Sequence, residues 1–143
     1  MEELADSRIG QILRQKKQKV TPQRTEIIRV LSEEKRPMNS KEIFESVTKK
    51  IKGISLDTVY RNVMLLVKNG LVSKIHLEQG GAALFEFQPE KKHYHAVCTS
   101  CNSVHCLDEV SLPTKISVQG DNHFQVEQVA LEVYGLCGSC NAS

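Results

Sequence analysis

The sequence contains two Cys-x-x-Cys pairs, Cys98 with Cys101 and Cys137 with Cys140. A pair with this spacing can present both thiolates to one metal ion, and tetrahedral zinc binds four such ligands. Four thiolates leave no position for water or substrate, so the metal would stabilise the fold rather than react. Disulfides and a redox Cys-x-x-Cys are the alternatives, but two pairs in a short chain without a secretion signal favour zinc. We expect a structural zinc ion on these cysteines.

A second set of possible ligands lies beside the first cysteine pair. His93 and His95 are separated by one residue, so in an extended strand both imidazoles point to the same side. Glu86 precedes them in a run of β-forming residues and could add an oxygen ligand. Such a mixed set suits iron, manganese or zinc, and a pair of exposed histidines is an equally open interpretation. His105 and Cys106 are further soft donors, although Cys106 fits equally well as a small buried residue.

Charge is distributed unevenly along the chain. Residues 1–75 hold sixteen Lys or Arg against nine Asp or Glu, a formal charge of +7, whereas the remainder holds three against eight, a formal −5. The basic half suggests a nucleic-acid partner, although solvated helix faces would give the same pattern. No window approaches the roughly 18 apolar residues of a membrane span. The acidic start lacks the apolar core of a signal peptide, so we expect a cytoplasmic protein.

The elements that must position these residues begin with four expected helices. The first is rich in Lys and Arg and has apolar residues at helical spacing between Ile9 and Leu13. The fourth ends at Asn69-Gly70, a typical C-terminal signal. Start signals for the second, third and fourth helices are, in turn, an N-cap with proline at Thr21-Pro22, a capping box at Asn39 with Glu42, and a polar cap at Ser55 or Asp57.

Beyond residue 70 the pattern changes from helix to strand. Residues 71–77 and 83–87 are rich in β-formers and flank Gln79-Gly80-Gly81, which predicts a β-hairpin. Compact helices followed by a hairpin are typical of a winged helix-turn-helix, in which the hairpin is the wing. We therefore expect a winged-helix DNA-binding domain over residues 1–88.

A smaller domain is expected after a polar break at residues 89–92, which we interpret as a linker. The expected elements are strands near 96–98 and 104–107, a helix over 109–118 and a strand over 124–134. They would place the two cysteine pairs on separate strands of a small sheet. The predicted fold class is α+β: a winged helix-turn-helix followed by a small α/β domain with a four-cysteine zinc site over residues 93–143.

Five motifs occur in a fixed order along the chain: Val20-Thr21-Pro22-Gln23-Arg24, Ser55-Leu56-Asp57-Thr58-Val59-Tyr60-Arg61-Asn62, His93-Tyr94-His95, the Cys98/Cys101 pair and Tyr134-Gly135-Leu136-Cys137-Gly138-Ser139-Cys140. Taken together, these motifs resemble the ferric uptake regulator (Fur) family of bacterial metal-dependent repressors, from about residue 10 to residue 140. The resemblance implies a dimerisation domain after the winged helix, a homodimer, a palindromic AT-rich DNA operator and a regulator that is not an enzyme.

The resemblance also implies where the protein contacts DNA. Residues 55–68 would be the recognition helix in the major groove, with Tyr60 on thymine methyls and Arg61 on guanine or phosphate. Thr58 and Asn62 would donate hydrogen bonds to the DNA backbone. Basic residues outside this helix would supply phosphate contacts and make binding salt-dependent: Arg24, Lys16, Lys17 and Lys19.

The regulatory metal site of the family is matched only in part. It takes a His near the start of the third helix, an acid in the wing, the His-x-His pair and an acid after the first zinc knuckle. Glu86, His93 and His95 match. The third-helix segment reads Arg36-Pro37-Met38-Asn39, no His occurs before residue 76, and Cys106 stands where the acid is usual.

At most three of the five usual regulatory ligands remain, and Val129 also stands where many members carry another His. Three modes of sensing stay open: a rearranged metal site, oxidation of the Cys106 thiol, and constitutive repression without a sensor. The rearranged site would bind Fe²⁺, Mn²⁺ or Zn²⁺ through Glu86, His93, His95 and Cys106, with or without His105. Two other classes compete with the regulator: a zinc-bearing protein-interaction module, and a zinc enzyme that uses His93, His95 and Glu86.

Overall fold

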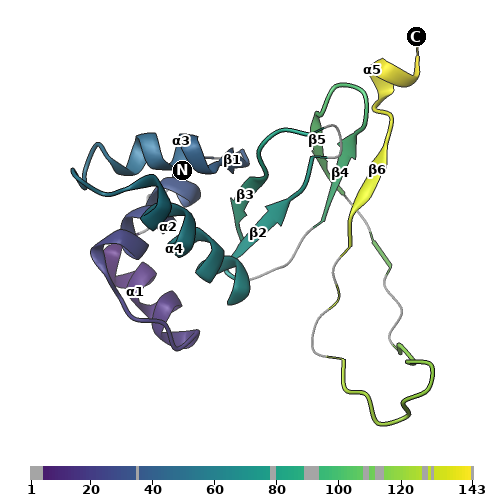
Figure 1. The fold of residues 1–143 in the computed structure, drawn as a ribbon, viewed down its shortest axis with the longest axis horizontal. Coiled ribbons are helices and arrows are strands. Elements are labelled where there is room, and N and C mark those ends of the chain that lie inside the picture. The colour runs from purple at the N-terminus through teal and green to yellow at the C-terminus, as the bar shows by residue number, and fades with distance from the viewer. Residues whose placement is uncertain are drawn as a thin grey trace. The chain divides into compact units, whose positions relative to one another are not determined.

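A computed structural model describes residues 5–34, 36–77, 80–88, 94–107, 110–111, 115–126, 129 and 131–142. The chain forms two compact units, an N-terminal unit (Met1–Lys92) and a C-terminal unit (His93–Ser143). Helices and a hairpin make up the first unit, and a small sheet with a terminal helix makes up the second (Figure 1). Within the described residues, no helix is both long enough and apolar enough to cross a membrane.

The N-terminal unit is a helical cluster with a small antiparallel sheet (Figure 1). Strand order in this sheet is β1-β3-β2, and the register pairs Met38 with Phe85 and Lys74 with Phe85 on the two sides of β3. The strands β2 and β3 form the predicted hairpin. The elements in chain order are α1 (Asp6–Gln15), α2 (Pro22–Glu33), β1 (Met38–Asn39), α3 (Ser40–Val47), α4 (Leu56–Lys68), β2 (Val72–Ile75) and β3 (Leu84–Phe87).

Side-chain caps fix where three of these helices begin. Thr21 accepts a hydrogen bond from the backbone N–H of Arg24 at the start of α2, and Ser55, not Asp57, does the same for Thr58 in α4. Asn39 and Glu42 form the predicted capping box of α3, with bonds of 2.8 and 3.2 Å. Each cap satisfies backbone donors that would otherwise lack an intrahelical partner, so these starts are encoded locally.

One hydrophobic core holds the N-terminal unit together. It takes residues from every helix and strand of this unit, so each element is fixed by burial against the others. Its fully buried members include Ile27 from α2, Ile43 from α3, Leu66 from α4 and Phe85 from β3. Arg29 adds a polar tie between α1 and α2 because it forms ion pairs with both Asp6 and Glu26.

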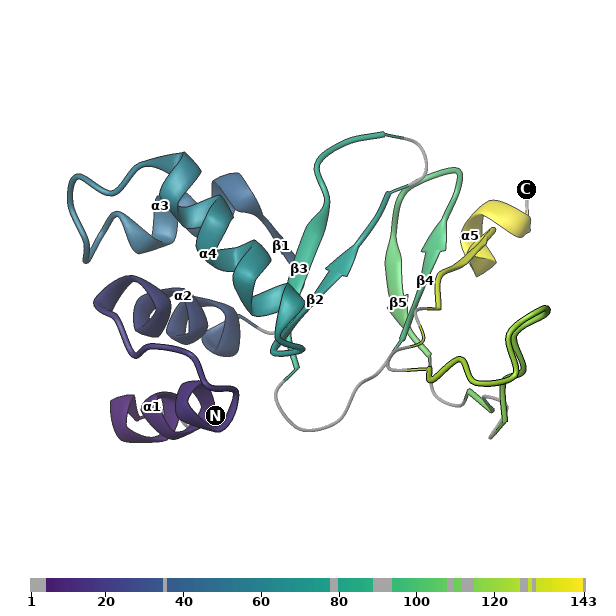
Figure 2. The same ribbon diagram turned by 60° about the horizontal axis from the view of Figure 1, so that its bottom comes forward.

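The C-terminal unit is a three-stranded sheet followed by a short helix (Figure 1), and Figure 2 shows its strands β4 and β5 side by side. The strand order is β5-β4-β6, and β4 pairs antiparallel with β5 and parallel with β6. The buried hydrophobic residues of its described part are Val97 and Cys98, and His95 is also buried. Its elements are β4 (His95–Cys98), β5 (Val104–Cys106), β6 (Val133–Gly135) and α5 (Gly138–Asn141).

Two secondary-structure predictions for this unit are wrong in the residues that the structure describes. Residues 110–111 and 115–118 of the expected helix over 109–118 are not helical. The expected strand over 124–134 begins only at Val133. Phe124 and Val126 are exposed, and β-forming residues favour a strand mainly where their side chains pack against neighbours. Their residue types alone therefore do not make this segment a strand.

Candidate zinc centre and DNA-binding surface

Two adjacent strands bring the cysteine pairs together. The parallel register of β4 and β6 places Cys98 beside Gly135, so Cys137 follows just beyond the strand end. The turn after β4 is closed by two backbone bonds, Asn102 N–H to Cys98 O and Cys98 N–H to Ser103 O, both 2.9 Å. Asn102 has φ of 61°, a left-handed conformation that Asn tolerates better than most residues. The turn therefore directs Cys101 back toward Cys98.

The second knuckle is formed by the start of α5. Cys137 is the N-cap residue of this helix, and Cys140 lies one turn later. The thiols of Cys137 and Cys140 therefore lie on the same side of α5. The backbone N–H of Asn141 donates to Cys137 O at 2.9 Å and closes the turn. Thr99 N–H donates to Gly135 O at 2.8 Å, which ties the two knuckles to each other.

The four thiols form one cluster whose dimensions fit zinc. The Sγ atoms of Cys98, Cys101, Cys137 and Cys140 all lie within 4.8 Å of one another, and those of Cys101 and Cys137 are 3.8 Å apart. A tetrahedron with Zn–S bonds of about 2.3 Å has edges of about 3.8 Å. Among the described residues, this is the one group of three or more His, Cys, Asp or Glu side chains that can share a metal ion.

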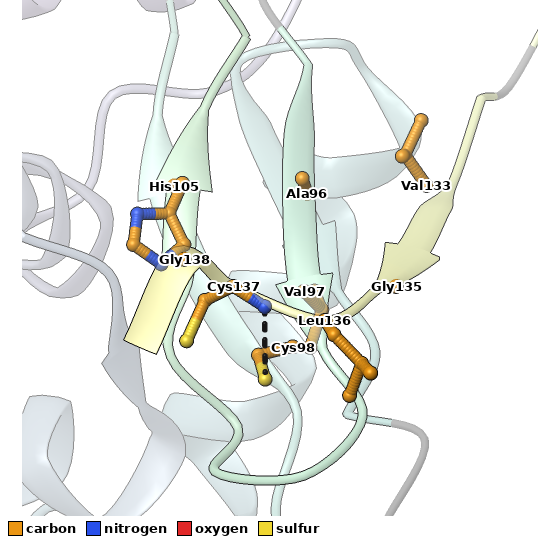
Figure 3. Close-up of a pocket in the computed structure, with 9 residues that line it drawn as sticks. All are labelled: Ala96, Val97, Cys98, His105, Val133, Gly135, Leu136, Cys137 and Gly138. Carbon is orange, nitrogen blue, oxygen red and sulfur yellow. Dashed lines mark hydrogen bonds between the residues drawn. The ribbon is translucent and has the colours of Figure 1, made fainter. Parts of the chain in front are cut away.

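Hydrogen bonds prepare part of the cluster to carry negative charge. The backbone N–H of Cys137 donates to Cys98 Sγ at 3.4 Å (Figure 3), and this bond together with one from Cys101 lowers the pKa of Cys98 to about 6. The backbone N–H of Cys140 lowers the pKa of Cys137. For Cys140, a bond with Ser100 lowers the pKa, but the neighbouring thiols outweigh it and raise the pKa to about 12. A divalent cation removes that mutual penalty, because it favours every thiolate at once.

A cavity of about 320 Å³ adjoins the cluster. Ser103 Oγ lies 3.1 Å from Cys101 Sγ and 3.0 Å from His105 Nε2, so one hydroxyl links a cluster thiol to the imidazole at the cavity wall. Sequence reasoning missed Ser103, and the signal that could have found it is its position two residues after Cys101. The lining, drawn in Figure 3, consists of Ala96, Val97, Cys98, His105, Val133, Gly135, Leu136, Cys137 and Gly138.

The residues predicted for a second metal site are distributed over both units. His95 on β4 lies directly opposite Cys106 on β5, so their side chains share one face of the sheet. His95 is buried and Cys106 is exposed. Glu86 belongs to the N-terminal unit, where it pairs with Ser73 in the hairpin. His93 lies outside the described residues. Within the described part of the C-terminal unit, the structure thus brings together one His and one Cys of this set.

Helix α4 presents part of the predicted recognition set to solvent. Tyr60 is 41% exposed, and the side chain of Arg61 is 72% exposed and paired with Asp57 at 3.0 Å. Thr58 is half-buried, and its Oγ1 lies 2.8 Å from Ser55 Oγ at the helix start. Tyr60 and Arg61 are therefore the members of this set that are most available to a ligand.

The remaining predicted DNA contacts flank α4. Lys16, Lys17 and Lys19 are exposed in the segment between α1 and α2. Arg24 on α2 is half-buried: its Nε donates to Asn62 Oδ1 at 3.2 Å and its Nη1 donates to Lys19 O at 3.0 Å. The contact between Arg24 and Asn62 joins positions 38 residues apart, so no local sequence signal predicts it.

Comparison with known proteins places the chain among transcriptional regulators. Residues 15–134 match the model of the Ferric uptake regulator family. The chain is 32% identical over 139 residues to the Ferric uptake regulation protein of Bacillus subtilis (strain 168), covering 94% of this chain and 93% of that one. It is 30% identical over 128 residues to the Peroxide operon regulator of the same organism, covering 86% and 84%.

A solved structure supports the same assignment at the level of fold. The ferric uptake regulator Fur of Helicobacter pylori, which has three functional metal binding sites, matches with a TM-score of 0.67 over 100% of this chain and 99% of that one, at 19% identity. The family match covers most of the chain, and the fold, the zinc-compatible cluster and the exposed α4 face agree with it. The chain therefore belongs to the ferric uptake regulator family of DNA-binding transcriptional regulators.

Proposed function

We propose that this protein is a homodimeric, metal-responsive repressor that reads a palindromic AT-rich operator through α4. One observation carries the proposal: a capped helix of the basic N-terminal unit presents Tyr60 and Arg61 to solvent. A helix with exposed aromatic and guanidinium groups in its first turns fits the major groove, where such groups reach thymine methyls and guanine edges. In this proposal residues 1–88 bind DNA, residues 89–92 link, and residues 93–143 dimerise.

Arg61 is held ready for DNA by a weak internal bond. Its partner Asp57 is 74% exposed, and exposed ion pairs contribute only about 0–1 kcal/mol. A guanine edge or a phosphate can therefore replace Asp57 at little cost. Lys16, Lys17 and Lys19 would add phosphate contacts that fix the position of the protein on the duplex.

The zinc ion in this proposal is structural and is held by Cys98, Cys101, Cys137 and Cys140. Bound to four thiolates, zinc supplies charge neutralisation and a rigid crosslink, and it offers no open position for catalysis. A role as regulator rather than enzyme, and a location in the cytoplasm beside the chromosome, follow from the same proposal.

Regulation would use the divergent second site. His95 and Cys106 share one face of the sheet, and we include Glu86 and His93 as further candidate ligands. A thiolate tilts this set toward zinc or a similarly soft cation. Because Cys106 is exposed, its oxidation is the alternative signal. Titration of zinc-replete protein with Fe²⁺, Mn²⁺ or Zn²⁺, read out as operator affinity, tests the metal site. Treatment with peroxide, with the same readout, tests the thiol: peroxide sensitivity that Cys106→Ser abolishes would support oxidation.

Selection of duplexes from a randomised pool, followed by mobility shift over a salt series, tests DNA recognition. We expect one palindromic sequence to be enriched, and Arg61→Ala to cost about 1–3 kcal/mol of its discrimination. Arg36→Ala is the matched control, because Arg36 is an exposed arginine that is likewise paired with a carboxylate, Glu42, and is not among the predicted DNA contacts. Absence of any sequence preference in every metal state would contradict the proposal and favour a protein-interaction module.

A further inference from the structure

Asn62 lies on the recognition helix, yet both ends of its amide are engaged inside the protein. Its Oδ1 accepts a hydrogen bond from Arg24 Nε at 3.2 Å, and its Nδ2 donates to the Thr58 carbonyl one turn earlier at 2.9 Å. The side chain is half-buried between α4 and α2. The bond to Thr58 fixes which way the amide faces, so the oxygen points at Arg24.

Arg24 is correspondingly held at two points. Asn62 binds its Nε, and the backbone carbonyl of Lys19 binds its Nη1 at 3.0 Å. Its backbone N–H also donates to the Thr21 cap, which fixes the start of the same helix. A guanidinium carries more N–H donors than these two bonds use, and the side chain keeps part of its surface in solvent. The unused donors can therefore bind an anion.

We infer that Asn62 acts on DNA through Arg24: it is a positioning residue that holds the Arg24 guanidinium for a backbone phosphate. This inference rests on the proposed DNA-binding function and specifies how one phosphate contact is built. Arg24 and the Lys19 carbonyl lie where the exposed Lys16, Lys17 and Lys19 cluster meets α2. Positive charge is concentrated there, and a held arginine loses less freedom on binding phosphate than a free one.

The test compares Asn62→Leu with Asn69→Leu in the full-length protein. Asn69 is the matched control because its Nδ2 donates to the Leu65 carbonyl at 2.8 Å, the same bond to the preceding turn, and no arginine bond to its side chain is seen in the described part of the chain. The duplex is the sequence that wild-type protein enriches from a randomised pool. The slope of log affinity against log salt is measured, since each lost phosphate contact lowers it by about 0.9.

We expect Asn62→Leu to lower the slope by about 0.9 for each bound protomer, as Arg24→Gln does, and Asn69→Leu to leave it unchanged. The double variant Arg24→Gln with Asn62→Leu should show no further loss, because both changes remove the same contact. Additive losses, or a wild-type slope for Asn62→Leu, would overturn the inference. Base preference at each operator position should stay the same in all four variants.

A second measurement does not depend on DNA. Nitrogen NMR of the free protein should show slow hydrogen exchange at Arg24 Nε in wild type and Asn69→Leu, and fast exchange in Asn62→Leu. Fast exchange in wild type would refute the hydrogen bond between Arg24 Nε and Asn62. If no duplex is enriched although this bond is detected, the proposed DNA-binding function fails while the contact between Arg24 and Asn62 is confirmed. Asn62→Ser replaces Asn62→Leu if thermal unfolding shows that the latter does not fold.

Discussion

In the part of the chain that the structure describes, the N-terminal unit buries sixteen hydrophobic side chains in one cluster, whereas the buried hydrophobic residues of the C-terminal unit are Val97 and Cys98. Large apolar side chains are even exposed in the second unit, with Phe124 at 57% and Leu136 at 55%. Apolar burial contributes roughly 25 cal/mol per Å², so the first unit can be stable through its core. The second unit needs another source of stability.

Two sources fit what the second unit presents. Four thiols within 4.8 Å of one another can be crosslinked by zinc, and an exposed apolar surface can be covered by a second copy of the chain. The difference between the units predicts two kinds of stability in one chain: the first unit would be stabilised by its own core, and the second by what it binds. A unit stabilised by binding would also be the one that responds to a change in metal or partner.

Loss of zinc should have the largest effect on this comparison. We expect Cys101→Ser to abolish metal binding and unfold the C-terminal unit while the N-terminal unit stays folded, because zinc coordination supplies about 10 kcal/mol or more in small domains. Elemental analysis gives the zinc-to-protomer ratio, and the NMR spectrum reports each unit separately. Cys106→Ser is the control, since Cys106 lies outside the cluster. A folded C-terminal unit without zinc would break the comparison.

Truncation of a side chain in the core of the N-terminal unit should have the next largest effect, and this effect should be confined to that unit. Leu66 is fully buried in α4, and Leu66→Ala should lower the free energy of unfolding of the N-terminal unit by about 2–5 kcal/mol. Leu56→Ala on the same helix is the control, because Leu56 is 46% exposed. Denaturation followed by circular dichroism measures both. A fall in zinc content in Leu66→Ala would show that the units are coupled.

The sequence predicts the N-terminal unit better than the C-terminal unit for the same physical reason. Caps such as Asn39 with Glu42 are local, and apolar periodicity reports burial in a large core, so helices α2 to α4 can be located from sequence. The described residues within 109–134 are not part of such a core, so the apolar and β-branched residues among them give a misleading signal. The strand β1 was also missed, because a two-residue strand exists only where β3 pairs with it.

The candidate sites follow the same division. Cys-x-x-Cys spacing predicts that two thiols share a ligand, and the structure gathers all four. The opposition of His95 and Cys106 depends on the register of β4 and β5, which sequence spacing does not specify. The contact between Arg24 and Asn62 depends on how α2 packs against α4 and leaves no trace in either motif.

Exposed apolar residues of the second unit should stabilise the dimer. We expect Phe124→Ser to raise the dissociation constant of the dimer roughly tenfold or more, since burial of such a side chain contributes about 1.5–3 kcal/mol. Sedimentation equilibrium measures this constant, and His123→Ser, at an adjacent exposed position, is the control. An unchanged dimer would leave zinc as the main source of stability in this unit.

The smallest effect concerns an ion pair on the surface of the first unit. The hydrogen bond from Arg36, at 2.6 Å, lowers the pKa of Glu42 below its ordinary value of 4.5, and the backbone N–H of Asn39 adds to this. Because the folded-state pKa is lowered, the pair stabilises the protein above the unfolded pKa and loses its effect as pH falls through the folded one. Glu42→Gln keeps a side chain that can cap α3 but removes the charge.

Glu42→Gln should therefore cost less than about 1 kcal/mol at pH 7, because Arg36 is well exposed, and the difference from wild type should shrink below about pH 4.5. Glu45→Gln, an exposed position on the same helix, is the control. Denaturation at a series of pH values gives both curves. A pH-independent difference would mean that Glu42 acts through its cap alone. The Arg36–Glu42 ion pair would then contribute nothing measurable to the stability of the N-terminal unit, and the contrast between an apolar core and a charged metal site would be sharper.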